Sequence, residues 1–132
     1  MTYLIIRRWD EDFHPTSTNR KEDLSEAIAL ADKIGGFYQE VDFANKNTRF
    51  MVVDPITKTV SYNQAAEDKE NIQALRNERN RKLADSDWIS TKSYDVGTAI
   101  PGEWKTYRQA LRDLPANTAD PTNITWPEEP EL

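Results

Sequence analysis

The hydrophobic pattern of this sequence changes from strand spacing to helix spacing near residue 65, and this change restricts the possible folds. Before that point, apolar residues form short β-favouring runs or alternate with polar residues, which is typical of strands. After it, apolar residues recur every three or four positions, as along one face of a helix. The sequence therefore predicts an α+β protein, with a small antiparallel sheet first and helices second.

The first part, residues 1–64, is predicted to be a small α+β domain with the order β-α-β-β-β. Its helix is expected over residues 24–34, where apolar residues fall at helical spacing. Asp23 is suited to the N-cap, and Gly35 can end the helix because glycine accepts the left-handed conformation. The remaining elements are expected as a loop over residues 10–21 and strands over residues 3–9, 37–43, 49–53 and 57–62.

The second part, residues 65–115, is predicted to be a helical hairpin. Its helices are expected over residues 66–84 and 103–114, with a linker between them and Pro115 ending the second helix. The aromatic residues Trp88, Trp104 and Tyr107 are expected in the hairpin core, because large aromatic side chains bury much apolar area. Residues 116–132 are predicted to form an extended proline-rich C-terminal tail.

Charge and composition exclude several classes of protein. The chain has 132 residues with a net charge of −6. Neither half carries the basic excess of a general nucleic-acid-binding protein. The absence of cysteine excludes disulfides and thiolate metal sites. The apolar run near the N-terminus is too short for a signal peptide or a membrane span, so we expect a protein that is cytosolic at synthesis and has no membrane partner.

No residue pattern in the sequence indicates catalysis. Asp85 and Asp87 have no neighbouring histidine, matched third carboxylate or calcium-type loop. The single histidine, His14, lies in a polar segment without a nucleophile motif. We therefore predict no catalytic residue, cofactor or metal site, and do not expect an enzyme.

The charged residues of the hairpin allow two interpretations. The basic residues of the first helix could grip an acidic partner segment, or they could form a solvated face balanced by nearby carboxylates. The solvated face is favoured because charge runs are usually solvated, and nucleic acid is disfavoured because no aromatic stacking platform accompanies the run. The basic residues in question are Arg76, Arg79, Arg81 and Lys82.

Three further residues have both a structural and a binding interpretation. Arg108 and Arg112 lie one helical turn apart and can pair with Asp85 or Asp87 across the hairpin, which is the favoured role. They could instead bind a partner's carboxylate bidentately. For Trp126, in the proline-rich tail, docking on the protein itself and docking on a partner both stay open.

Four short pieces of the C-terminal part follow one another in a set order. They are RNERNRKLA at 76–84, Asp87-Trp88, YRQALRDLP at 107–115, and Trp126-Pro127. Taken together, they resemble the phage tail assembly chaperone family, whose module also occurs in tail-fibre assembly proteins. The resemblance does not extend to the N-terminal part, and the linker between the second and third pieces has a sequence of its own.

The resemblance implies a non-catalytic bacteriophage tail or tail-fibre assembly chaperone. Such a protein would bind a phage tail or tail-fibre protein in the host cytoplasm during virion morphogenesis. A sheet edge in the first domain and an apolar groove on the hairpin are the expected contact surfaces. The alternative is a structural component of the tail, baseplate or fibre attachment that stays in the virion. The candidate partner-binding residues are Trp126, Pro127, Arg76, Arg79, Arg108 and Arg112.

Overall fold

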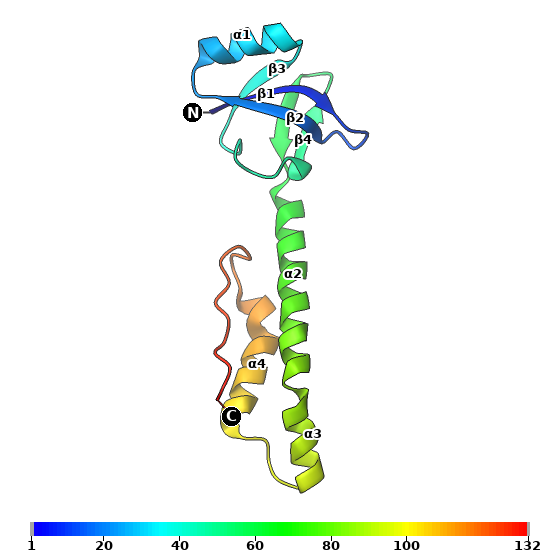
Figure 1. The fold of residues 1–132 in the computed structure, drawn as a ribbon, viewed down its shortest axis with the longest axis vertical. Coiled ribbons are helices and arrows are strands. Elements are labelled where there is room, and N and C mark those ends of the chain that lie inside the picture. The colour runs from blue at the N-terminus through cyan, green and yellow to red at the C-terminus, as the bar shows by residue number, and fades with distance from the viewer. Residues whose placement is uncertain (1, 132) are drawn as a thin grey trace. The chain divides into compact units, whose positions relative to one another are not determined.

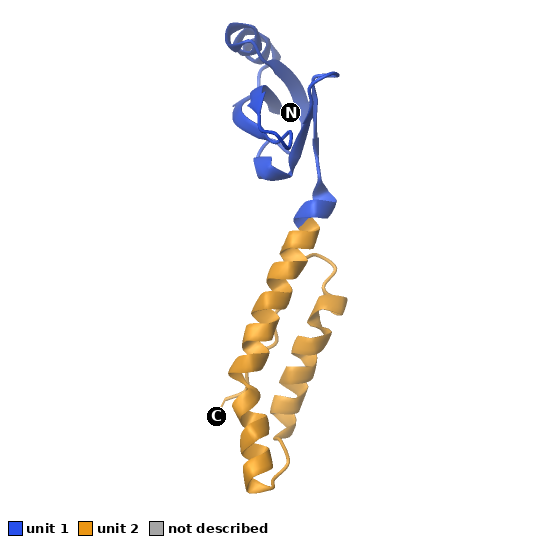
Figure 2. Cartoon of the chain, turned by 90° about the vertical axis from the view of Figure 1, so that its right-hand side faces the viewer, with its two compact units in different colours: residues 1–67 blue, residues 68–132 orange. Residues whose placement is uncertain are grey.

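A computed structural model describes residues 2–131 of the chain and confirms the α+β class, with a helical hairpin after the sheet region. The chain forms two compact units that divide between Glu67 and Asp68 (Figure 2). The predicted division into domains at 1–64, 65–115 and 116–132 stays a prediction. No helix within residues 2–131 is both long and apolar enough to cross a membrane.

The first unit contains two antiparallel sheets (Figure 1). In the larger sheet, β1 (Thr2–Trp9) lies between β2 (Pro15–Lys21) and β3 (Phe37–Val41). In the smaller sheet, β4 (Met51–Asp54) pairs with β5 (Thr59–Tyr62). β1 is therefore the central strand of the larger sheet, with β2 on one side and β3 on the other.

The prediction of a loop over residues 10–21 was wrong, because β2 occupies most of that segment. Only Pro15 of this strand is buried, so it lacks the alternating apolar residues by which a strand is found in a sequence. A second correction concerns residues 49 and 50, which belong to a short 3₁₀ helix, η1 (Thr48–Phe50). The side chain of Asn47 caps it by accepting a hydrogen bond from the Arg49 N–H.

The helix α1 (Leu24–Ile34) has the ends that the sequence predicts. The Asp23 carboxylate accepts a hydrogen bond of 3.0 Å from the Glu26 N–H, which satisfies a backbone donor at the N-terminus. At the other end Gly35 has a φ of 71°, in the left-handed region that favours glycine. A side chain on Gly36 would lie 2.4 Å from a backbone oxygen of β1, so only glycine fits there.

The two faces of β1 are buried against different parts of the unit. Ile5 packs on one face against Ala27 and Ala31 of α1, and the small alanines allow the helix to lie close to the sheet. Leu4 and Ile6 point to the other face and are fully buried. Their core is completed by side chains from β3, β4, β5 and the connecting loop, namely Val41, Ala44, Met51, Val53 and Val60.

A side chain joins the two sheets on one side. Gln39 of β3 donates a hydrogen bond of 2.9 Å to the Val60 carbonyl and accepts one of 2.7 Å from the Val60 N–H. A primary amide can donate and accept at once, so Gln39 takes the place of a paired strand residue. The backbone groups of β5 that face β3 are thereby satisfied.

The tip of the β1–β2 hairpin closes the other side. The Phe13 carbonyl accepts a hydrogen bond of 2.8 Å from the Val53 N–H, and the His14 ring lies 2.8 Å from the Met51 carbonyl. Phe13 has a φ of 63°, which is uncommon for a residue with a side chain. These contacts occupy backbone groups on the outer edge of β4, so a partner strand cannot pair with those groups.

The second unit is a hairpin in which α2 (Gln64–Asp85) runs antiparallel to α4 (Gly102–Asn117) (Figure 1). The expected linker over residues 85–102 was wrong, since α3 (Asp87–Val96) continues after a break at Ser86. Its sequence buries only Ile89, so no apolar periodicity marks it. Pro115 also does not end α4, because in the last turn it removes only one backbone hydrogen bond.

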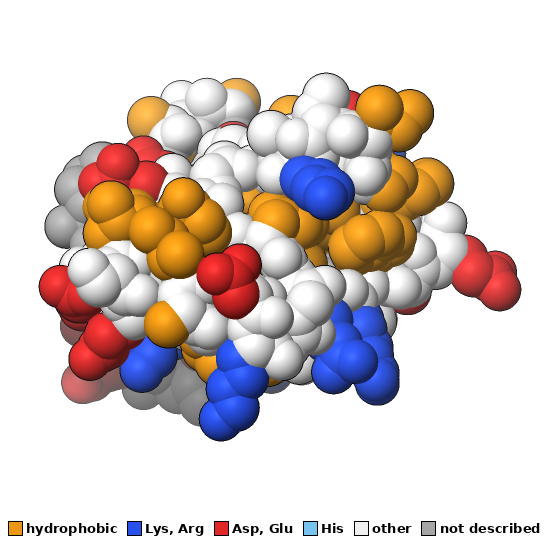
Figure 3. Space-filling model, turned by 90° about the horizontal axis from the view of Figure 1, so that it is seen from above, with side chains coloured by type: hydrophobic (Ala, Val, Ile, Leu, Met, Phe, Trp, Pro, Cys, Tyr) orange, Lys and Arg blue, Asp and Glu red, His pale blue; other side chains and the backbone are white. Residues whose placement is uncertain are grey.

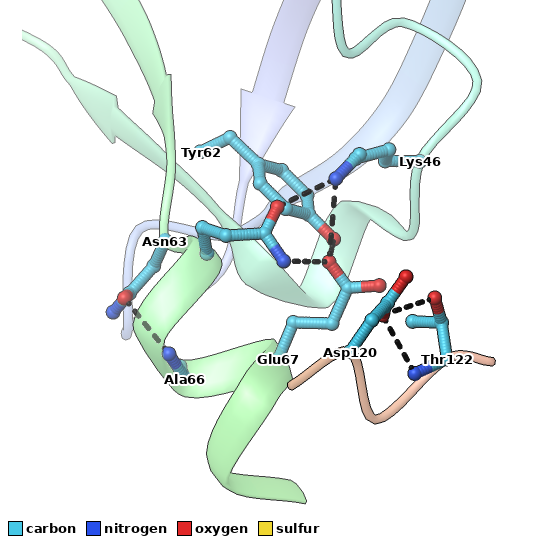
Figure 4. Close-up of polar contacts among 8 residues, drawn as sticks. Lys46, Tyr62, Asn63, Ala66, Glu67, Asp120 and Thr122 are labelled. Atoms are coloured by element: carbon cyan, nitrogen blue, oxygen red, sulfur yellow. Dashed lines mark hydrogen bonds and ion pairs between the residues drawn. The ribbon is translucent and has the colours of Figure 1, made fainter. Parts of the chain in front are cut away.

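The start of α2 is held by polar contacts, which Figure 4 shows in close-up. The Asn63 side chain accepts a hydrogen bond of 3.1 Å from the Ala66 N–H. The Tyr62 hydroxyl donates one of 2.6 Å to the Glu67 carboxylate, and the Lys46 ammonium lies 3.5 Å from the same carboxylate. The hydrogen bond from Tyr62 and the positive charge of Lys46 hold the pKa of Glu67 below its usual value.

We predict that Gln39→Ala destabilises the first unit by about 2 kcal/mol, because it removes two hydrogen bonds and leaves part-buried backbone groups unsatisfied. Urea unfolding followed by the β-sheet signal of circular dichroism would measure the change. Glu40→Ala is the matched control, since Glu40 is an exposed residue of the same strand. Equal stability of the two variants would contradict the bridging role of Gln39.

We also predict that Tyr62→Phe raises the pKa of Glu67 toward its ordinary value, because the phenylalanine cannot donate the hydrogen bond. With a folded-state pKa below the unfolded one, Glu67 stabilises the fold above its unfolded pKa and loses this effect as pH falls through the folded pKa. Carboxyl-detected NMR titration would measure the shift. Tyr94→Phe serves as control, as Tyr94 is 89% exposed, and a Glu67 pKa that is the same in both variants would refute the assignment.

Candidate protein-binding site

The guanidinium group of Arg108 joins all three helices of the hairpin. From α4 it donates a hydrogen bond of 2.9 Å to the Leu83 carbonyl in α2, and another to the Ser86 hydroxyl at the break. It donates a third, of 2.8 Å, to the Asp87 carboxylate in the first turn of α3. We call these contacts the Arg108 clamp.

The Arg108 clamp explains how the break between α2 and α3 is tolerated. Ser86 is almost fully buried, and its hydroxyl also donates a hydrogen bond of 3.0 Å to the Leu83 carbonyl. A carbonyl in the last turn of a helix has no hydrogen-bond donor within the helix. Here the side chains of Ser86 and Arg108 both donate hydrogen bonds to the Leu83 carbonyl. The rigid fork of arginine suits several acceptors at once, and the Arg108 side chain is only 11% exposed.

The expected pairing of hairpin arginines with acidic residues is confirmed for Arg108 and is wrong for Arg112. The exposed Arg112 guanidinium donates a hydrogen bond of 3.4 Å to Gln109, one turn earlier on α4. The backbone carbonyl of Arg112 accepts a hydrogen bond of 3.5 Å from the Arg79 guanidinium of α2. Among the described residues, the structure therefore brings Arg79 and Arg112 together along one side of the hairpin.

The basic run on α2 is partly neutralised within its own helix. Arg81 lies 2.6 Å from Glu78 and 3.1 Å from Asp85, and Lys82 lies 3.9 Å from Glu78. The hydrogen bond from Arg81 holds the pKa of Glu78 below its usual value. Arg76 is exposed to solvent. These contacts fit the solvated face that the sequence favours.

The aromatic core of the hairpin differs from the expectation at one position. Trp104 and Tyr107 are buried, as predicted, and pack edge-to-face beside Leu111. Trp88 is 43% exposed, so its predicted place in the core was wrong. It lies in the first turn of α3 and covers Trp104 with only an edge contact, at a ring distance of 6.1 Å.

The C-terminal tail turns back after α4 and runs alongside it (Figure 1). The Asp120 carboxylate forms the turn by accepting hydrogen bonds from the Thr122 N–H and hydroxyl, at 2.9 and 2.6 Å (Figure 4). Farther along, the Trp126 ring packs on the hairpin core, and the Lys82 ammonium lies 5.4 Å from its centre. The structure therefore docks Trp126 on the protein itself.

A groove lies between the tail and α4, and we call it the tail groove. The Tyr107 side chain forms part of its floor. Burial, together with the negative charges of Glu129 and Asp85, raises the pKa of Tyr107. On the helix side the groove is lined by Glu103, Thr106, Tyr107 and Ala110, and on the tail side by Pro127, Glu128, Glu129, Pro130 and Glu131.

The first unit offers a less continuous surface. Leu24 and Ile28 of α1 are 44% and 37% exposed. Seen from the α1 end, apolar side chains form separate patches divided by polar and charged groups (Figure 3). Among residues 2–131 no group of three potential ligand residues could hold a metal ion.

Comparison with known proteins places the hairpin and tail in a phage context. Residues 72–131 match the family of the phage tail assembly chaperone protein, so the C-terminal half of the chain resembles that family, as the sequence motifs predict. The match supports a role in phage tail assembly. No curated protein and no solved structure matches the chain.

Two residues of the site were not predicted from the sequence. Ser86 precedes an aspartate at a helix start, which is a common capping signal, but its hydroxyl donates to the Leu83 carbonyl and caps no N–H of α3. Lys82 belongs to the basic run, and no pattern in the sequence indicates its contact with Trp126, because the two residues are distant in sequence. The pairing of Asp87 with Arg108 could be predicted, since the two motif pieces face each other across a hairpin.

We predict that Arg108→Ala destabilises the hairpin by about 2 kcal/mol, because hydrogen bonds from a charged group to the buried Ser86 and the partly buried Leu83 are lost. Arg108→Lys should recover only part of this, since an ammonium lacks the fork. Amide hydrogen exchange over residues 83–90 would measure the local opening. Arg112→Ala, at an exposed position of the same helix, should change it little. Equal protection from amide exchange over residues 83–90 in the Arg108→Ala and Arg112→Ala chains would contradict the Arg108 clamp.

Proposed function

We propose that this protein is a bacteriophage tail or tail-fibre assembly chaperone, which binds a tail or fibre protein in the host cytoplasm during virion morphogenesis and catalyses no reaction. The observation that carries the proposal is the family match over residues 72–131. This range holds most of α2, all of α3 and α4, and the tail, so the matched segment covers nearly all of the second unit.

A physical need supports this function. Long β-rich tail fibres expose strand edges and apolar surface before they assemble, and such surfaces mispair or aggregate. A small partner that covers them during synthesis keeps the fibre protein available for assembly. The exposed charges of this chain, with a net charge of −6, would help to keep such a complex soluble.

The proposed contact surface lies on the second unit. Arg76, Arg79 and Arg112 are candidates for pairing with a partner's carboxylates, and Trp126 with Pro127 for apolar contact. The role of Arg108 as a partner ligand is the least supported of these, because its side chain is largely buried in the clamp. A contact through Trp126 requires the tail to leave the hairpin.

We predict that co-expression with this chain raises the soluble yield of a tail or fibre protein of the same phage, because its aggregation-prone surface is covered. The yield in the soluble fraction and co-purification with the chain would measure the effect. Leu111→Asp, which places a charge in the hairpin core, should abolish it. Ile56→Asp should not, since Ile56 is 91% exposed and lies in the first unit.

The proposal would be abandoned if the yield of every tail protein of the phage were the same with and without the chain. Mass spectrometry of purified virions separates it from the alternative, a structural component of the tail, baseplate or fibre attachment. A chaperone is absent from the particle or present in traces, whereas a structural component is present in fixed stoichiometry.

A further inference from the structure

A second groove, of about 680 Å³, runs along α4 on the hairpin. Ser90 of α3 and Ile100 of the connection between α3 and α4 contribute to its lining. Three basic residues on successive turns of α4, Lys105, Arg108 and Arg112, line it as well. We call it the basic groove. No described residue of the C-terminal tail lines it, so a ligand can enter it without displacing the tail.

The positive charge of the basic groove is only partly neutralised by the protein. Arg108 is paired in the clamp, but among the described residues neither Lys105 nor Arg112 forms an ion pair. Asp113 is the one acidic residue in the described lining, and its carboxylate accepts a hydrogen bond of 3.0 Å from Gln109. Like charges three or four positions apart destabilise a helix. A bound anion would therefore relieve a repulsion that the fold leaves in place.

Arg108 adds a hydrogen-bond donor that the clamp does not use. A guanidinium carries five N–H groups, and the three hydrogen bonds of the clamp leave the Arg108 Nε–H without a partner. No buried side-chain nitrogen among the described residues lacks a hydrogen bond, so this Nε is accessible to solvent. The clamp fixes the guanidinium, which lowers the entropy cost of a further contact. Because Arg108 lines the basic groove, an anion there can accept a hydrogen bond from a preorganised donor.

The lining also has an apolar part, which restricts the kind of anion. Ile100 is half-buried against the hairpin core, and Ala110 lies in the same groove. The exposed Lys105 and Arg112 are separated by two turns of α4, about 10 Å along the helix axis. About three residues of an extended chain cover that distance. An extended segment with two carboxylates and an apolar residue between them therefore matches the groove.

Nucleic acid matches the basic groove less well. The described lining contains no aromatic residue on which a base could stack. A phosphate chain is held by many cations along its length, whereas this groove offers three and also contains Asp113. The net charge of −6 would repel a polyanion at long range. A short acidic protein segment meets less of this repulsion and uses the apolar part of the lining.

We propose that the basic groove binds an extended acidic segment of a partner protein. Its carboxylates pair with Lys105 and Arg112, one of them accepts a hydrogen bond from the Arg108 Nε–H, and an apolar side chain between them contacts Ile100. The identity of this partner as a phage tail or fibre protein rests on the proposed function. The chemistry of the groove is independent of it.

A fluorescein-labelled peptide with one leucine between two pairs of glutamates tests the basic groove on the full chain. Fluorescence anisotropy should show binding to the wild-type chain, and Lys105→Glu or Arg112→Glu should weaken it at least about fivefold, because attraction becomes repulsion. Lys69→Glu is the matched control and should leave the affinity nearly unchanged, since it makes the same charge change at an exposed position of α2 outside the groove. A peptide with glutamines in place of the glutamates should not bind.

Three results would overturn the proposal. The first is an absence of binding to the wild-type chain, or an equal loss in Lys69→Glu and the groove variants. The second is a single-stranded DNA of equal charge that binds more tightly than the peptide and weakens in the same variants. The third is a wild-type dimer that Lys105→Glu dissociates, because a second copy would then occupy the groove. Circular dichroism checks folding, and Lys105→Gln or Arg112→Gln replaces a glutamate variant that loses helix, with a smaller loss of affinity expected.

The Nε–H signals of arginine in nitrogen-15 NMR spectra of the wild-type chain provide a second measurement. Arg108→Lys identifies the signal of Arg108 by its loss. The acidic peptide should shift this signal, and the glutamine peptide should not. The signal of Arg81, which is paired with Glu78 on α2, serves as an internal reference. An Arg108 signal that stays in place at saturating peptide would overturn the role of its Nε–H. These measurements need no phage protein, so this proposal and the co-expression experiment can fail separately.

Discussion

The hairpin depends on one largely buried arginine, Arg108. A chain that breaks a long helix must satisfy the backbone groups exposed at the break, and here Arg108 reaches across from the antiparallel helix to do so. The same guanidinium pairs with Asp87 at the start of α3. The break therefore sets the direction of α3, and α3 brings Ile89 and Trp88 to the aromatic cluster on which the tail rests. The proposed binding surface exists because the break is held in this form.

In the first unit too, groups from outside a strand satisfy backbone groups that a neighbouring strand would otherwise pair. Its five strands form two small sheets, and isolated two-stranded sheets are marginal in water. Gln39 on one side and the Phe13–His14 turn on the other connect them through their backbone groups. The two sheets then share one core. This arrangement also occupies outward-facing backbone groups of β4 and β5, which then cannot pair with a partner strand.

The sequence predicted the class of fold because apolar periodicity is strong where helices and strands bury one face, as in α1 and α4. The sequence did not predict elements that are held mainly by backbone hydrogen bonds and bury little apolar surface. β2 is polar and is held by pairing with β1, and α3 buries one residue, so neither leaves a periodic signal. The Arg108–Asp87 pair could be predicted because Asp87 follows the first expected helix and Arg108 lies on the second, across the expected hairpin. The Gln39 and Lys82 contacts could not, because they join residues whose distance depends on how the elements pack.

The chemical nature of Gln39 has a consequence for how the two units respond to ionic strength. Its amide carries no charge, so the contact between the sheets is indifferent to dissolved salt. The contacts that organise the second unit involve full charges, with Asp87 largely exposed to solvent beside Arg108 and an ammonium above the Trp126 ring. Dissolved ions screen such charges when solvent reaches them. Rising salt concentration therefore loosens the hairpin break and the tail while the paired sheets of the first unit stay closed.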